Sequence, residues 1–108
     1  MDKVFIVPFH VKRGRESLMP ANLVGAYVSC YTAADNYELA VGKCLSALRN
    51  SGLRVEEALQ PIHTMSMADW STHIAEQWPN QARQMPTQQD FEAAIKAGDV
   101  VYGPFGSY

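Results

Sequence analysis

The fold is decided by the stretch NLVGAYVSCYTAADNYELAVGKCLSALRNSGLRV, residues 22–55. Its first part, Leu23–Thr32, alternates as a β-strand does, because successive side chains of a strand point to opposite faces. One face carries small apolar side chains and the other carries mostly hydroxyl-bearing ones: Val24, Ala26, Val28 and Cys30 against Leu23, Tyr27, Ser29 and Tyr31. We expect the small apolar face to lie under a helix.

That helix is predicted over Asp35–Asn50. Asp35 is expected to cap its first turn, and Glu38 three residues later completes a pattern like the capping box. Gly52 suits the left-handed turn that ends a helix, and a second strand then begins at Leu53. The apolar side chains form one stripe at helical spacing: Tyr37, Ala40, Val41, Cys44, Leu45 and Leu48.

An earlier strand is predicted over Lys3–Lys12, with apolar side chains on both faces in its first half, as in an interior strand. Pro8 cannot donate to a ladder, so a bulge or a gap in pairing is expected there. Strands joined by a crossover helix run parallel and often leave room for one antiparallel strand between them. The expected order is therefore second, first, third.

The rest of the chain adds short elements. Leu53–Met65 is expected to be an irregular strand, with a bulge near Glu57 or a break into two strands. Further elements are a helix after the cap at residues 66–69, a short helix after the cap at residues 87–90, and a strand over 100–102. We therefore predict one α+β domain, residues 1–108. It should be a two-layer sandwich with a mixed or antiparallel four-stranded sheet and helices on one face.

The segment GAYVSCYTAADNYELA, residues 25–40, resembles small uncharacterised bacterial proteins with a ferredoxin-like, split strand–helix–strand arrangement. In those proteins an outward aromatic strand enters a helix through an acidic cap. The resemblance covers about a third of the chain. It implies a fold and transfers no functional residue.

Composition narrows the function classes. The chain has 108 residues, a net charge of −2 and 47% apolar residues, so a nucleic-acid role is disfavoured. No apolar run is long enough to span a membrane, and the first residues lack the features of a signal peptide. We therefore expect a cytoplasmic protein in which Cys30 and Cys44 are buried, reduced thiols.

The sheet face away from the helix is the main functional candidate. No helix is evident in the sequence to cover it, and it should carry Ile6, His10, Tyr27, Ser29 and Tyr31. An exposed aromatic face often marks an interaction site. The leading hypothesis is a binding or accessory protein that forms a homodimer through this face. A protein or small-molecule partner is left open.

Two other function classes are carried forward. One is a small enzyme with His10 or His63 as general acid or base, in a cleft between the open sheet face and the basic loop Arg13–Asn22. In that loop Arg13 and Arg15 are candidates for anion contacts. The other is an immunity-type inhibitor of a partner protein. Asp69 and His73, at i and i+4, are interpreted as a surface pair. We find no cofactor motif and no metal-ligand spacing.

Overall fold

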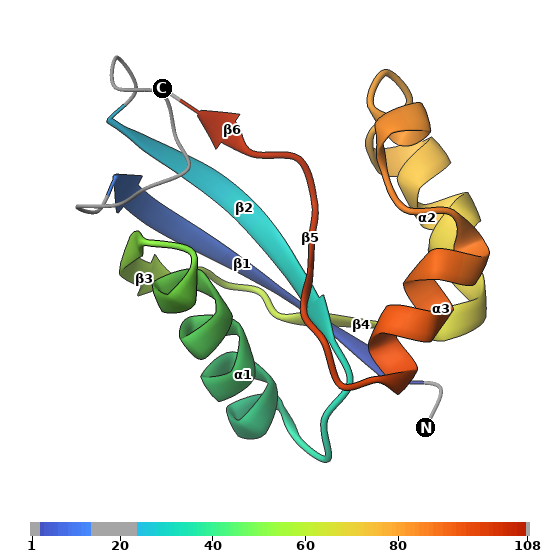
Figure 1. The fold of residues 1–108 in the computed structure, drawn as a ribbon, viewed down its shortest axis with the longest axis horizontal. Helices are drawn as coiled ribbons and strands as arrows, with labels where there is room; N and C mark the ends of the chain where they lie inside the picture. Colours follow the sequence, from blue (N-terminus) through green and yellow to red (C-terminus); the bar gives the residue numbers. More distant parts are fainter. Residues whose placement is uncertain (1–2, 14–23, 108) are drawn as a thin grey trace.

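The computed structural model describes residues 3–13 and 24–107, which form an α+β fold around an antiparallel open sheet (Figure 1). The strands are β1 (Lys3–Arg13), β2 (Gly25–Thr32), β3 (Leu53–Ala58), β4 (His63–Ser66), β5 (Val101–Tyr102) and β6 (Gly106–Ser107). The helices are α1 (Tyr37–Asn50), α2 (Trp70–Gln77) and α3 (Gln88–Lys96), with 3₁₀ turns at Met67–Asp69 and Ala82–Gln84.

The long strand β1 lies at the centre of the sheet. The strand order is β3-β1-β2-β5, which confirms the expected order of the first three strands. β4 also pairs with β1 and β6 pairs with β2, so the described residues form six strands and not the expected four. The extra strands arise because the predicted strand after Leu53 breaks in two and because the tail returns to β2.

Pro8 explains where that break falls. On the β2 side, Pro8 is opposite Ser29 within an unbroken ladder. On the other side, pairing with β3 ends at Phe9 and pairing with β4 begins at Ile6. The carbonyl of Pro8 accepts from Leu59 N–H at 2.8 Å in this gap. Because N–H and C=O of one strand residue point the same way, the missing donor of Pro8 also falls in the gap.

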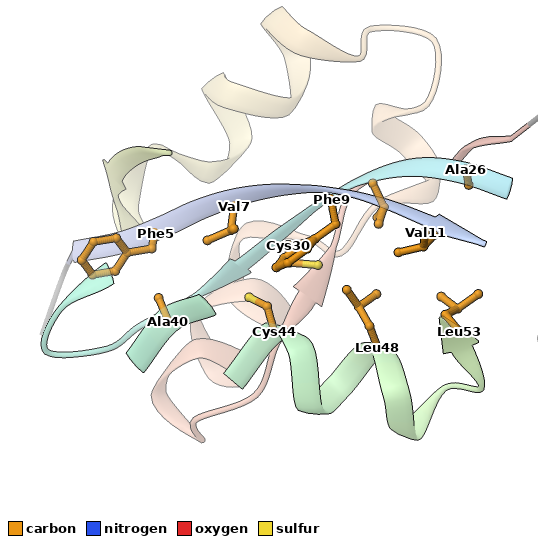
Figure 2. Packing of buried hydrophobic residues seen from close by; sticks show 11 residues of the cluster. Phe5, Val7, Phe9, Val11, Ala26, Cys30, Ala40, Cys44, Leu48 and Leu53 are labelled. Atoms are coloured by element: carbon orange, nitrogen blue, oxygen red, sulfur yellow. The ribbon is translucent and has the colours of Figure 1, made fainter. Parts of the chain in front are cut away.

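The helix α1 covers one face of the sheet with the predicted stripe (Figure 2). Ala40, Cys44 and Leu48 are buried against the strands, whereas Tyr37 at the start of the stripe is exposed. The helix cap is Asn36 and not Asp35, because the Asn36 side chain accepts from Leu39 N–H at 2.9 Å. The chain leaves α1 through Gly52, whose φ of 80° is left-handed.

The two cysteines face each other between β2 and α1 (Figure 2). Both are free and fully buried. A hydrogen bond with Cys44, together with burial, raises the pKa of the Cys30 thiol far above its ordinary value. The thiol form is therefore strongly favoured at neutral pH.

Helices also cover the opposite face of the sheet, so the expectation that all helices pack on one face is wrong. A second apolar cluster joins Val4 and Tyr31 of the sheet to Trp70 and Ile74 of α2 and to Phe91 of α3. These helices lie over one end of the face only (Figure 1). The ferredoxin-like relationship stays a prediction. In the part of the chain that the structure describes, no helix is long and apolar enough to cross a membrane.

Candidate functional site

Three side chains on adjacent strands lie side by side on the sheet face that α2 partly covers. Ile6 of β1 is directly opposite Tyr31 of β2 on one side and His63 of β4 on the other. Directly opposed residues of antiparallel strands share a face, so this row forms a continuous floor. Ser29 lies two residues from Tyr31 on β2 and therefore extends the same face.

The roof above this floor comes from α2. Trp70 and Ile74 are buried, and Trp70 stacks on Phe91 with ring centroids 4.0 Å apart. The Trp70 indole N–H also donates to the carbonyl of Pro86 at 2.8 Å. These contacts fix the rotation of α2, so that His73, three residues after Trp70, faces the sheet.

Trp78, directly after α2, closes one end of the site. Its ring lies against the backbone of Gly103, because a Cβ at that position would come within 2.9 Å of the indole. Gly103 is held in place by donating its N–H to Ser29 O at 2.8 Å. The position of Trp78 at this end of the site therefore depends on glycine at position 103.

The central contact of the site joins Tyr31 to His73. The Tyr31 hydroxyl lies 2.7 Å from His73 Nε2. Burial raises the pKa of the Tyr31 phenol well above its ordinary range, and burial lowers the pKa of His73, partly offset by the charge of Glu76. Both groups are therefore neutral near pH 7. We assign Tyr31 as the donor, since a phenol is the stronger donor and an imidazole nitrogen the stronger acceptor.

Floor and roof enclose a pocket of about 360 Å³. Ile6 in the floor and Trp78 at one end give the pocket apolar surface, and Ser29, His63 and Gln77 supply polar groups. His63 is exposed, whereas His73 is half-buried. Such a site can hold a compact molecule and exchange hydrogen bonds or a proton with it. No group of three or more His, Cys, Asp or Glu side chains arranged to hold a metal ion occurs in residues 3–13 and 24–107.

The structure brings together four of the predicted site residues and separates two. Ile6, Ser29, Tyr31 and His63 all line the pocket. His10 and Tyr27 lie further along the sheet, outside the pocket, and stack with ring centroids 4.7 Å apart. The expectation that Tyr31 is exposed is wrong, because α2 and α3 bury it completely, whereas Tyr27 remains 51% exposed.

The side chains of α2 that line the pocket are not among the residues that the sequence predicts for the site. His73 was assigned to a surface pair with Asp69, but its hydrogen bond goes to Tyr31 on the sheet. Gln77 lies one helical turn after His73 and lines the same pocket. The sequence does show that His73 and Gln77 border the apolar stripe of α2. The stripe alone does not show which surface of the protein α2 packs against.

The basic loop expected after the first strand is described only at its first residue. Arg13 ends β1, while Arg15 and the rest of the expected loop lie outside the described residues.

Comparison of the chain with family models, with curated proteins and with solved structures finds no match. The candidate site therefore rests on the geometry of this chain alone.

Proposed function

We propose that this chain binds a small molecule in the pocket between β1, β2, β4 and α2. The observation that carries the proposal is the Tyr31–His73 hydrogen bond at the wall of a pocket of about 360 Å³. Small-molecule sites have volumes of roughly 300–1,000 Å³ and combine apolar walls with a few convergent polar groups. This pocket fits both criteria, with Ile6 and Trp78 as walls and Ser29, His63 and Gln77 as polar groups.

The lining indicates the chemistry of the ligand. Trp78 and Ile6 offer apolar surface for a flat or compact body. The neutral imidazole of His73, whose Nε2 accepts from Tyr31, keeps its Nδ1 N–H to donate, and the side chains of Ser29 and Gln77 can each donate or accept a hydrogen bond. Because no lysine or arginine is among the described residues that line the pocket, a neutral or weakly basic molecule suits it better than an anion.

A fragment screen by ligand-observed NMR tests the proposal. Wild-type protein is compared with Gln77→Trp, which should fill the pocket, and with Ala75→Trp, which places the same bulk on an exposed part of α2 outside the lining. We expect fragments that bind wild type and Ala75→Trp but lose affinity at least about tenfold for Gln77→Trp. Equal binding by all three proteins, or no binder in the millimolar range, would contradict the proposal.

A second candidate function is acid–base catalysis in the same pocket, supported by the two imidazoles that line it. His73 is neutral and fixed by Tyr31, whereas the exposed His63 is free to reach a bound molecule. Because Tyr31 occupies Nε2 of His73, the general base would be His63, with His73 donating its Nδ1 N–H to the bound molecule. Bound fragments should then change chemically over hours, and His63→Gln should stop the change while the fragments still bind. Unchanged spectra for every bound fragment would contradict catalysis.

Self-association through the part of the same sheet face around Tyr27 is an independent candidate. The specific observation is Tyr27, which is half exposed beside His10. Tyrosine offers a large contact area with a polar tip, as is typical of interfaces. Light scattering over a range of concentrations should show a dimer that Tyr27→Asp dissociates and that Tyr37→Asp, on exposed α1 surface, does not. A monomeric wild-type protein would contradict it.

A further inference from the structure

Among the strands that the structure describes, β5 pairs with β2 alone, so its other edge carries backbone groups that pair with none of them. Residues 101 and 102 pair with Tyr31 and Cys30 of β2, and the next residue, Gly103, donates its N–H to Ser29 O. Hydrogen-bonded and non-hydrogen-bonded pairs alternate along an antiparallel ladder. The N–H and C=O of Tyr102 therefore point away from β2. Within residues 3–13 and 24–107, no hydrogen bond to either group is seen.

A groove runs between α1 and residues 98–100, the segment that enters β5. It consists of two adjoining hollows, of about 570 Å³ and about 480 Å³, which share Leu39, Lys43 and Gly98. Val100, which leads into β5, lines the larger one. α1 forms the opposite wall, and at Gly42 a Cβ would meet nothing within 4 Å.

We propose that this groove docks an extended segment of a partner polypeptide, which adds a strand to the outer edge of β5. Two observations identify a polypeptide as the occupant. The outward N–H and C=O of Tyr102 match the donor and acceptor spacing of another extended backbone, and a helix wall beside a sheet edge gives alternate side chains of that strand a place to pack. A small molecule would leave the strand edge unpaired.

The residues that line the groove indicate which side chains of the partner segment would fit in it. Leu39 is 53% exposed and Gly42 and Ala47 are small, so this wall suits apolar side chains of moderate size. The ammonium of Lys43 donates to Ala33 O at 2.8 Å and is thereby tied to the segment between β2 and α1. Acidic and basic groups both border the groove, which favours recognition through the backbone and apolar contacts over recognition through net charge.

A phage-displayed library of random heptapeptides, selected on the whole protein, provides the probe. Enriched peptides are synthesised and titrated into three proteins: wild type, Gly42→Trp, which fills the open space on the groove wall, and Gly42→Ala, which leaves it open. We expect wild type and Gly42→Ala to bind equally and Gly42→Trp to bind at least about tenfold more weakly. Both substitutions replace a helical glycine, so neither should threaten α1.

Amide hydrogen exchange supplies the readout that is specific to strand addition. The Tyr102 N–H should exchange quickly in the free protein and become protected when peptide is bound. The Val101 N–H, which already faces β2, should be protected in both states. The proposal is overturned if no peptide is enriched, if Gly42→Trp binds as well as Gly42→Ala, or if Tyr102 gains no protection. A wild-type dimer that Gly42→Trp dissociates would also overturn it, and would identify a second copy of the chain as the occupant.

Discussion

The hydroxyl of Tyr31 on β2 and Nε2 of His73 on α2 lie 2.7 Å apart, which ties the helical cover to the central sheet. Around this bond, Tyr31 also meets the rings of Trp70, Trp78 and Phe91 edge-on. Tyr31 therefore belongs both to the second apolar cluster and to the lining of the candidate pocket. The position of α2, and with it the shape of the pocket, depends on this residue.

Tyr31→Phe should lower the free energy of unfolding by about 1 kcal/mol. The substitution keeps the ring contacts but removes the hydrogen bond and leaves Nε2 of the half-buried His73 unpaired. Tyr37→Phe, on the exposed surface of α1, is the matched control and should change stability by less than about 0.5 kcal/mol. Urea denaturation measures both. Similar values for the two variants would show that the bond contributes little.

The free energy of unfolding should decrease as the pH falls below about 6.5, in part because of His73. Burial lowers the pKa of His73 in the folded protein below that in the unfolded chain. Between these two pKa values the unfolded chain binds more protons, so acidification favours unfolding, and the effect levels off below the folded pKa.

Thermal denaturation between pH 5 and 8 checks this dependence. His73→Gln should flatten the profile in that window, whereas Ala75→Gln, at an exposed position of α2 without a titratable group, should leave the profile like that of wild type. A titration of the histidine rings by NMR should place the midpoint of His73 below the ordinary value. A midpoint for His73 above about 6.5 would reverse the predicted sign.

Gly103→Ala should destabilise the protein by about 1 kcal/mol and move Trp78, because an added Cβ comes within 2.9 Å of the indole ring. Gly106→Ala is the control, since its Cβ would meet only Tyr27 O at an ordinary 3.7 Å. Tryptophan fluorescence together with urea denaturation measures both effects. An unchanged emission spectrum for Gly103→Ala would mean that Trp78 does not rest on this backbone.

Asn36→Ala should cost about 1 kcal/mol of stability, because it removes the side-chain cap of α1. Asp35→Ala should cost less, since no capping bond from Asp35 is seen in the described part of the chain. The comparison separates the cap that the structure shows from the one that the sequence pattern suggested. A larger loss for Asp35→Ala would restore the sequence-based assignment.

Much of the sheet could be predicted because its signals are local. Alternation along β2 assigns Ala26 and Cys30 to the face under α1, and the structure confirms both. Pro8 indicated a gap in pairing, which the break between β3 and β4 confirms. The position of α2 was not predictable in the same way. Its apolar stripe showed that one side is buried, but burial against Tyr31 involves residues about 40 positions apart.

In the candidate site, too, the residues on the strands could be predicted from local patterns, whereas those on α2 could not. Strand alternation places Ile6, Ser29 and Tyr31 on one face, and the pairing of β4 with β1 brings His63 beside them. His73 was missed, because a helical histidine next to an acidic residue has the same local pattern whether it pairs with that neighbour or with a distant strand. Only the tertiary packing of Trp70 on Phe91 turns it towards the sheet.

A crystal structure of the protein with its tightest-binding fragment tests the central claim most directly. We predict that the fragment lies between Ile6 and Trp78, within hydrogen-bond distance of His63, His73 or Gln77. The bond between Tyr31 and His73 should remain intact in that complex. A fragment bound on another surface, with this pocket empty, would contradict the account.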